Sequence, residues 1–500
     1  MPSAPDIVIG LDIGTTSTMG VAVRMPDEIL AVARRPVTLT SLKPGWAEED
    51  PEEWWANTVD ILREIAAAVE PRALAGICVT GMLPAVVLLD AEGRLLRPSI
   101  QQSDGRCVEQ VEELRRDYDE TAFLKRTGNG INQQLVGAKL RWIAANEPEV
   151  FGRIATVFGS YDYINWRLTG VRAVEQNWAL EAGFTDLATN AIADDLVALA
   201  GIPRSAVPPR SVSHQRMGAI SAEAAALTGL PEGLPVFGGA ADHIVSALAA
   251  GISRSGDVLL KFGGAGDIIV ASDRAVPDKR LYLDYHLIPG LYAPNGCMAS
   301  SGTALNWLTT ILQTASGTNN PHQALDALAD QVAPGADGLV CLPYFLGEKT
   351  PIHDPLARGA FVGLSLLHTP AHIWRATLEA VAFGFRHHID VLADMGHRPQ
   401  RFMASDGGTA SRVWMQIMAD VLGKPVQLLE NHYGSAVGAA FVAAIGAGLS
   451  SDWGDVARLS RYGEEMQPSA DRHAAYNRVY GNYRQLYEIL VPYFHATTRV

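Results

Sequence analysis

The chain has 500 residues, of which 48% are hydrophobic and 19% are charged, and its formal net charge is −14. A chain of this length and composition is globular and too long for a single core, so we expect two or more domains. The negative charge argues against a nucleic-acid or anionic-membrane partner, because both require clustered lysine and arginine. A small phosphorylated ligand needs only a local group of donors and stays compatible with this charge.

The cysteines and the N-terminus indicate the compartment. Four cysteines are scattered along the chain without a CxxC pair, which favours reduced thiols over a disulfide framework or a zinc site. The first residues lack the charged and apolar regions of a signal peptide. The apolar stretch 436–448 is rich in Ala and Gly and too short to span a bilayer. We therefore expect a cytoplasmic protein with no membrane partner.

The first informative stretch is an apolar, β-branched run over residues 7–13 that contains one carboxylate, Asp12. Gly14, Thr15, Thr16 and Ser17 follow it, which predicts a strand, a tight turn and a second strand. A carboxylate in a buried strand is costly unless it is hydrogen-bonded or binds a metal, and the turn offers N–H and hydroxyl donors to a phosphate. The stretch predicts a turn that binds a metal and a phosphate. The alternative is an ordinary hairpin with a surface-facing Asp.

Helical patterns follow the first hairpin. Asp50 before Pro51, with acidic residues next, is typical of a helix N-terminus, and this helix should reach about residue 69. Further helices are predicted over 107–117 and 136–146. Residues 160–190 are mixed and polar, and we expect a surface lobe there.

A second candidate site residue, Asp242, lies where a strand passes into a helix. Val236 and Phe237 are followed by Gly238, Gly239 and two alanines, and then by Asp242 at the start of a helical pattern. The small residues leave space above the strand end, which is where ligands bind in open α/β sheets. The alternative is that Asp242 only caps its helix.

Residues 257–270 repeat the pattern of the first hairpin in the second half of the chain. A strand leads into the turn Gly263-Gly264-Ala265-Gly266 and a second strand, so we interpret the chain as two similar α/β halves, each with a turn that can bind phosphate. The position of Asp12 corresponds to Lys261, so only the first half offers a carboxylate for a metal. Further on, Ser405–Ser411 form a Gly-rich turn into the helix 413–422, which is typical of a nucleotide contact.

Signatures of other enzyme classes are absent from the sequence. It has no GxxxxGK[ST] motif, no strand–GxGxxG–helix unit, no HExxH and no GxSxG. The remaining set of motifs resembles the FGGY family of carbohydrate kinases, in the actin/hexokinase/Hsp70-like ATPase superfamily. The most specific match is Gly359–Leu364 followed by His372–Glu379. Lys139–Ile143 matches in its Lys and Trp but departs from the family at Val136, and 342–351 and 44–55 resemble the pentulose-kinase (xylulokinase) branch.

The resemblance implies an α/β fold of two actin-like (ribonuclease H-like) ATPase domains with an interdomain cleft, which we place at 1–245 and 246–500. It implies ATP and Mg²⁺ as cofactors, Asp242 as the general base that takes the proton from the sugar hydroxyl, and Asp12 as the acid that organises Mg²⁺. A homodimer is common in the family. The residues implied to bind the nucleotide are Thr15, Thr16, Ser17, Gly263, Gly264, Gly266, Gly302, Asn306, Gly407, Gly408, Thr409 and Ser411.

The resemblance is weaker in the residues that would contact the sugar. Xylulokinases carry Gln-Met-His where this chain has Gly81-Met82-Leu83, so an imidazole that would hydrogen-bond the sugar is replaced by an alkyl group. We predict a xylulokinase-like kinase of a small sugar or polyol for which D-xylulose is not the best substrate. The candidate substrate contacts are Met82, Leu83, Pro84, Gln102, Asp104, Gln134 and Asp242. The alternatives are a chaperone or cytoskeletal ATPase on the same fold, and a catalytically silent relative that binds sugar or nucleotide.

Overall fold

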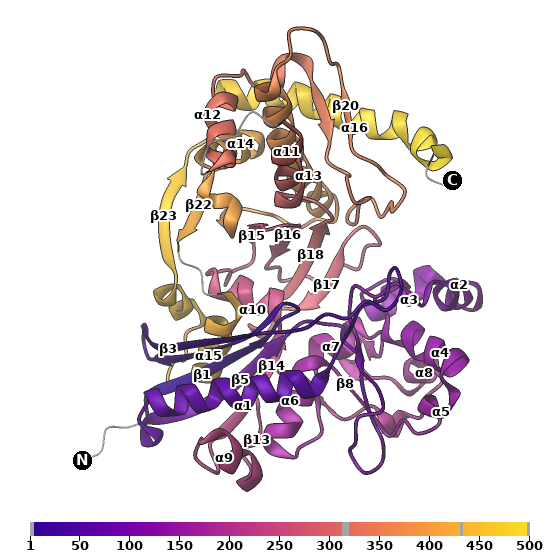
Figure 1. Ribbon diagram of the computed structural model, residues 1–500, viewed down its shortest axis with the longest axis vertical. Coiled ribbons are helices and arrows are strands. Elements are labelled where there is room, and N and C mark those ends of the chain that lie inside the picture. Colours follow the sequence, from indigo (N-terminus) through magenta and orange to yellow (C-terminus); the bar gives the residue numbers. More distant parts are fainter. Residues whose placement is uncertain (1–4, 313–319, 431–433, 498–500) are drawn as a thin grey trace.

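The computed structural model describes residues 5–312, 320–430 and 434–497. The described residues form two large sheets, one of six and one of seven strands. In Figure 1 the first half of the chain occupies the lower part of the molecule and most of the second half the upper part. No helix within the described ranges is both long and apolar enough to cross a membrane.

The first sheet has the strand order β13-β14-β5-β1-β2-β3. β1 forms an antiparallel hairpin with β2 and lies parallel to β5, as the strand–turn–strand pattern predicts. The bounds are β1 (Ile7–Ile13), β2 (Ser17–Arg24), β3 (Glu28–Pro36), β5 (Leu74–Gly81), β13 (Arg216–Ala219) and β14 (Pro235–Ala241).

The second sheet has the order β17-β18-β16-β15-β21-β22-β23. β15 forms an antiparallel hairpin with β16 and lies parallel to β21, so it is the counterpart of β1. β22 continues parallel to β21, as β14 does to β5. The internal repeat is therefore confirmed at the level of strand order. The bounds are β15 (Asp257–Phe262), β16 (Gly266–Val270), β17 (Tyr282–Tyr285), β18 (Tyr292–Met298), β21 (Arg401–Ser405), β22 (Val426–Glu430) and β23 (Arg461–Met466).

The helices of the first half are α1 (Pro51–Ala68), α2 (Val108–Asp117), α3 (Glu120–Thr127), α4 (Val136–Asn146), α5 (Pro148–Phe151), α6 (Ser160–Thr169), α7 (Gln176–Glu181), α8 (Asp194–Ala198), α9 (Ala222–Thr228) and α10 (Asp242–Ala249). The side chain of Asp50 accepts a hydrogen bond from the N–H of Glu52, which confirms the predicted start of α1. The surface lobe expected at 160–190 is wrong. α6 and α7 are mostly buried, because their polar residues are hydrogen-bonded inside the domain, as in the 2.9 Å contact from Tyr161 Oη to Glu175 Oε2.

The helices of the second half are α11 (Gly302–Leu312), α12 (Pro321–Ala329), α13 (Pro370–Asp394), α14 (Arg412–Leu422), α15 (Gly434–Gly446) and α16 (Ala470–Thr497). Short strands complete the fold: β4 (Glu48–Glu49), β6 (Val87–Leu89), β7 (Ser99–Ile100), β8 (Thr156–Phe158), β9 (Val174–Glu175), β10 (Thr185–Asp186), β11 (Ala191–Ile192), β12 (Arg210–Ser211), β19 (Val340–Leu342) and β20 (Ala360–Val362).

Two helices that follow equivalent strands, α10 after β14 and α15 after β22, pack against each other where the two halves meet (Figure 1). α15 belongs to the second half but lies on β1 and β5 of the first. It comes so close that a Cβ at Gly10 would lie 1.9 Å from the carbonyl oxygen of Ala436, so glycine is required there. The predicted boundary between residues 245 and 246 falls inside α10 and stays a prediction.

Candidate active site

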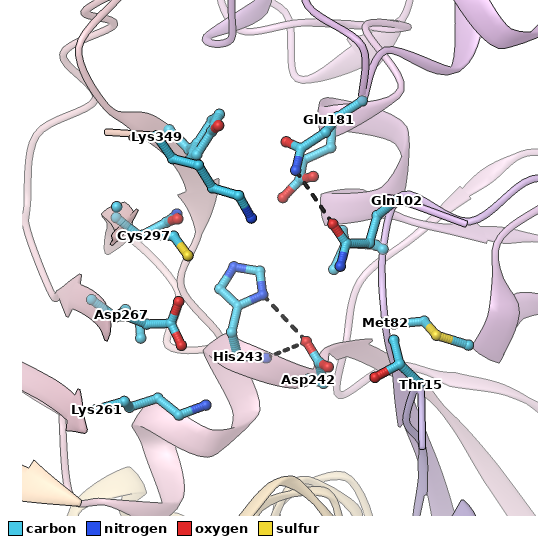
Figure 2. A pocket seen from close by; sticks show the side chains of 16 residues that line it. Thr15, Met82, Gln102, Glu181, Asp242, His243, Lys261, Asp267, Cys297 and Lys349 are labelled. Atoms are coloured by element: carbon cyan, nitrogen blue, oxygen red, sulfur yellow. Dashed lines mark hydrogen bonds and ion pairs between the residues drawn. The ribbon is translucent and has the colours of Figure 1, made fainter. Parts of the chain in front are cut away.

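A cavity of about 250 Å³ lies between the two halves of the chain. The first half contributes Thr15, Met82, Leu83, Gln102, Gln134, Glu181, Asp242 and His243, and the second contributes Lys261, Asp267, Ile269, Tyr282, Asn295, Gly296, Cys297 and Lys349. Figure 2 shows Asp242 and His243 near the centre of this group, with Gln102 and Met82 on one side and Lys261, Asp267 and Lys349 on the other. The cavity is polar and has the size of a small hydrophilic ligand.

Asp242 is the first residue of α10 and is held by its neighbour His243. The His243 N–H donates a 2.6 Å hydrogen bond to Asp242 Oδ1, and its ring Nδ1 lies 3.4 Å from the same oxygen. On the far side of the ring, Nε2 lies 3.0 Å from Oδ2 of Asp284 on β17. Asp284 is fully buried and also accepts a 2.9 Å hydrogen bond from Asn295. The imidazole thus connects the carboxylate in the cavity to a buried carboxylate of the second half.

This arrangement keeps Asp242 ionised. Burial raises its pKa, but the hydrogen bond and positive charge of His243, with the charge of Lys261, outweigh burial and hold the pKa below its usual value. For His243, burial lowers the pKa, while the hydrogen bonds to Asp242 and Asp284 raise it well above its usual value. The ring is therefore an imidazolium at neutral pH, and Asp242 presents a negative oxygen that can accept a proton.

Two further groups give the cavity a donor-rich end. Burial, followed by the negative charge of Asp284, raises the pKa of Glu181 well above its usual value, so this carboxyl is protonated and can donate a hydrogen bond. Lys349 is exposed and directs its ammonium into the cavity (Figure 2). Gln134 forms a 3.5 Å contact with Gln102, which lies on the same side of the cavity as Glu181 and across from Lys349 (Figure 2). A polyhydroxylated ligand would find donors and acceptors on several sides.

Asp12, on β1, lies at the meeting point of the two halves. Its Oδ2 accepts a 2.6 Å hydrogen bond from Ser435 Oγ at the start of α15, whereas its Oδ1 is buried and has no partner within the described part of the chain. Burial, with the negative charge of Asp242, raises the pKa of Asp12 to about 7. An unpartnered buried carboxylate oxygen next to a phosphate-type turn fits a Mg²⁺ ligand, because Mg²⁺ prefers oxygen donors and one or two carboxylates. The residues present therefore fit the metal predicted from the sequence.

A second cavity, of about 650 Å³, lies entirely in the second half. Gly-rich turns line one wall and aromatic rings another, including Trp374 and Trp414. The chain passes from one cavity to the other within a single turn, because Lys261 lines the first cavity and residues 262–264 line the second. Glycine turns and apolar walls suit a nucleotide, whose phosphates need close backbone contact and whose base needs a flat apolar surface.

The structure brings most of the predicted site residues to these two cavities. Thr15, Met82, Leu83, Gln102, Gln134 and Asp242 line the first, and Gly263, Gly264, Gly302, Asn306, Gly407, Gly408 and Ser411 line the second. Thr16, Ser17, Gly266 and Thr409 lie in the same turns but outside the cavity linings, and Ser17 Oγ accepts a 2.8 Å hydrogen bond from Arg34.

Two predicted sugar contacts, Asp104 and Pro84, are absent from the cavity lining. Asp104 is buried and accepts hydrogen bonds from the Ala47 N–H at 2.6 Å and from Arg106 at 2.7 Å, so its oxygens are already paired. The carbonyl of Pro84 accepts a 3.4 Å bond from Lys139, which also donates to the Gln101 carbonyl at 2.7 Å. The structure gives both residues a role in holding the loops that carry Met82 and Gln102.

Sequence reasoning missed Glu181, His243, Lys261, Asp284 and Lys349 as site residues. His243 and Lys261 carried a local signal, because one adjoins Asp242 and the other takes the position of Asp12 in the repeat. Glu181 lay in the segment misinterpreted as a surface lobe. Lys349 lies in the segment 342–351 that resembles the pentulose kinases, whereas no local pattern marks Asp284.

The chain matches the models of both domains of a known family. Residues 7–249 match the N-terminal domain of the FGGY family of carbohydrate kinases, and residues 265–447 match its C-terminal domain. The chain belongs to the FGGY family of carbohydrate kinases. It is therefore an ATP-dependent kinase of a sugar hydroxyl, and the predicted two-domain actin-like ATPase fold is confirmed. Family membership decides against the chaperone or cytoskeletal alternative.

Individual relatives extend over nearly the whole chain. The structure of a xylulose kinase from Rhodospirillum rubrum is 64% identical and superposes with a TM-score of 0.94 over 98% of this chain and 100% of that one. Xylulose kinase of Escherichia coli K12 is 28% identical over 97% of this chain and 99% of its own length. An L-xylulose/3-keto-L-gulonate kinase of the same strain is 27% identical over 98% of both chains.

Proposed function

We propose that this FGGY kinase transfers the γ-phosphoryl group of MgATP to a hydroxyl of a ketopentose or a closely related ketose or polyol, with Asp242 as the general base. The observation that carries the proposal is the position of Asp242. It is an ionised carboxylate, oriented by His243, in the cavity that lies between the first glycine turn and the second. The named activities of the similar kinases, on xylulose and on L-xylulose or 3-keto-L-gulonate, support this substrate class.

In this proposal the sugar occupies the first cavity and the nucleotide the second. Met82, Leu83, Gln102 and Gln134 contact the sugar, while Gly263, Gly264, Gly302, Asn306, Gly407, Gly408 and Ser411 bind the nucleotide. Thr15 lies in the first phosphate turn. When bound, Mg²⁺ would supply positive charge to the phosphates, and Asp12 would hold it. Asp242 accepts the proton of the attacking hydroxyl, and closure of the two halves around the ligands would exclude water and suppress ATP hydrolysis.

The choice of sugar follows from the wall formed by Met82 and Leu83. Leu83 lines the cavity with an alkyl side chain that cannot hydrogen-bond, so a hydroxyl directed at it would lose its hydration without gaining a partner. Glu181 and Lys349 provide polar groups elsewhere in the cavity. We therefore propose that D-xylulose is turned over less efficiently than another ketose or polyol. A cytoplasmic location and a homodimer stay predictions.

The test is a coupled ADP-release assay over a panel of pentuloses, hexuloses and polyols, with the wild type and Asp242→Asn. Because general base catalysis contributes roughly 10²–10⁴-fold, the variant should lose kcat by that factor while it still binds ATP. Asp194→Asn is a matched control, because Asp194 is also the first residue of a helix but is exposed outside the cavity. Near-wild-type turnover by Asp242→Asn would remove it as the base.

The panel separates the remaining alternatives. A kcat/KM that is highest for D-xylulose would overturn the specificity proposal but not the kinase reaction. No turnover of any sugar or polyol, with ATP still bound, would identify a catalytically silent relative instead.

A further inference from the structure

Lys261 takes the place in the second half that Asp12 takes in the first. Each is the residue before the last of a strand, β15 or β1, that ends at a glycine turn and forms a hairpin with the next strand. Side chains alternate along a strand. Lys261 therefore shares a face of β15 with Leu259, which packs into the core of the first half, whereas Leu260 packs into the core of the second. Asp12 lies on the face of β1 that meets α15, and Lys261 lies on the face of β15 that is turned toward the first half.

The correspondence between the two halves extends to the contacts of Asp12 and Lys261. Asp12 receives its hydrogen bond from Ser435 at the start of α15. The counterpart of α15 is α10, which begins with Asp242, and Figure 2 shows the Lys261 side chain pointing toward Asp242 and His243. The repeat thus brings a carboxylate from one sheet and an ammonium from the other to the same junction.

Within the described ranges the ammonium of Lys261 makes no hydrogen bond and no ion pair, and the residue is only partly buried. Burial lowers its pKa, but the charges of Asp267, Asp406, Asp242 and Asp12 raise it above the usual value, so the group stays charged. Lys261 is partly buried in the lining of the first cavity, so its ammonium is a charged donor that a ligand in the cavity can reach. A charged donor with no hydrogen bond of its own is suited to bind an anion that arrives with the ligands.

The position of Lys261 identifies that anion. Lys261 lines the proposed sugar cavity, and the next residues, Phe262, Gly263 and Gly264, line the proposed nucleotide cavity. The group transferred between the two cavities must pass this point. During transfer the negative charge is spread over the three equatorial oxygens of the phosphoryl group, and a cation fixed beside them stabilises that state.

We propose that the Lys261 ammonium is a catalytic group that contacts the phosphoryl group during its transfer from ATP to the sugar. The inference rests on the proposed function above. It divides the task of charge neutralisation between the halves: the first half presents Asp12 for the metal, and the second presents a cation of its own. The bond from the γ-phosphorus to the β,γ-bridging oxygen breaks, the bond to the sugar oxygen forms, the hydroxyl proton goes to Asp242, and Lys261 stays protonated throughout.

The experiment compares Lys261→Met, which removes the charge at similar length, with Lys349→Met, which removes an exposed cation from the same cavity. Calorimetry gives the affinities for ADP and for a non-hydrolysable ATP analogue, each with Mg²⁺, and the assay gives kcat on the best substrate of the panel. We expect Lys261→Met to lose about 10²–10³-fold in kcat, the usual cost of one such donor. Its ADP affinity should stay unchanged, while its preference for the triphosphate over ADP falls. Lys349→Met should change KM for the sugar and leave both nucleotide affinities unchanged.

Chemical rescue separates charge from structure. Added ethylammonium should restore part of the kcat of Lys261→Ala and none of the kcat of Asp242→Asn. If Lys261→Met melts well below the wild type, Lys261→Gln takes its place with the same expectations. A kcat within about threefold of the wild type in the folded neutral variant, or a loss shared equally by ADP and triphosphate binding, overturns the inference. If the wild type phosphorylates nothing in the panel, the proposed function fails instead, and the nucleotide affinities alone decide whether Lys261 binds the terminal phosphate.

Discussion

Ser435 Oγ donates a 2.6 Å hydrogen bond to Asp12 Oδ2, so the second half of the chain holds the carboxylate of the first. Ser435 is the second residue of α15, which packs on β1, and Asp12 lies on β1 beside the first glycine turn. The bond leaves Asp12 Oδ1 as the unpartnered oxygen, and it lowers the pKa that burial raises. A single contact thus couples the packing of the two halves to the proposed metal ligand.

We expect Ser435→Ala to weaken the use of Mg²⁺. A hydrogen bond to a charged group contributes about 1.5–3 kcal/mol, so the free Mg²⁺ needed for half-maximal rate should rise about tenfold as Asp12 loses its donor. Initial rates over a Mg²⁺ series at fixed ATP measure this. Ser450→Ala, which removes a half-buried hydroxyl that donates to Asp455 away from the site, is the control. An unchanged Mg²⁺ requirement would show that the bond does not orient Asp12.

We expect His243→Asn to move the acidic limb of the pH–rate profile to higher pH. His243 lowers the pKa of Asp242, and Lys261 is the other cation that does so. Without the imidazolium the pKa of Asp242 rises, so protonation inactivates the base at a higher pH. The profile of kcat/KM from pH 3.5 to 9 reports this, because the limb of the wild type lies below the usual pKa of an aspartate. Asp284→Asn, which removes the partner of His243 on β17, should shift the limb in the same direction. If kcat/KM falls at every pH while the acidic limb keeps its position, His243 does not have this role.

Glu49 lies outside the site, and we expect it to make the stability of the folded protein depend on pH. It is buried, its Oε2 accepts a 2.9 Å hydrogen bond from Trp54 and its Oε1 has no partner within the described ranges. Burial raises its pKa from 4.5 to about 8. The folded state therefore binds the proton more tightly than the unfolded state, so the stability is complete below pH 4.5 and is lost as the pH rises through 8.

Glu49→Gln should remove the loss of folding stability at high pH. The amide keeps an acceptor for Trp54 and carries no charge, so the variant should match the wild type at pH 4.5 and exceed it at pH 9, by at most a few kcal/mol. Melting temperatures at both pH values measure the difference. Glu64→Gln, which changes an exposed carboxylate paired with Arg35, should show no such pattern. Equal melting curves of wild type and Glu49→Gln at pH 9 would contradict the prediction.

Leu83→His should change which sugar is preferred. An imidazole in this wall could hydrogen-bond a hydroxyl that Leu83 leaves unpaired, a difference of roughly 1–3 kcal/mol. We expect kcat/KM for D-xylulose to rise about tenfold relative to the best substrate of the wild type. The same sugar panel measures the ratio, and Leu83→Met is the apolar control. If Leu83→His and Leu83→Met give the same ratio, the side chain at this position does not select the substrate.

Local patterns were sufficient for much of the fold. The β1–β2 and β15–β16 hairpins, the start of α1 at Asp50 and the turn before α14 all follow from neighbouring residues, because strands, caps and glycine turns depend on short-range geometry. The segment 160–190 failed for the opposite reason. Its polar residues resemble a surface, but their partners, such as Glu175 for Tyr161, bury them inside the domain.

The sequence by itself determined the family, the two glycine turns, and the acids Asp12 and Asp242, because these are local motifs whose spacing along the chain carries the information. Only the tertiary structure decided what surrounds those acids. Glu181, Asp284 and Lys349 lie on three separate segments, and the packing of the two halves brings them around Asp242 and His243. Asp104 shows the converse, because a carboxylate that looked available is already paired with Arg106. Burial and pairing set the charge of each group, and both depend on contacts between residues far apart in the chain.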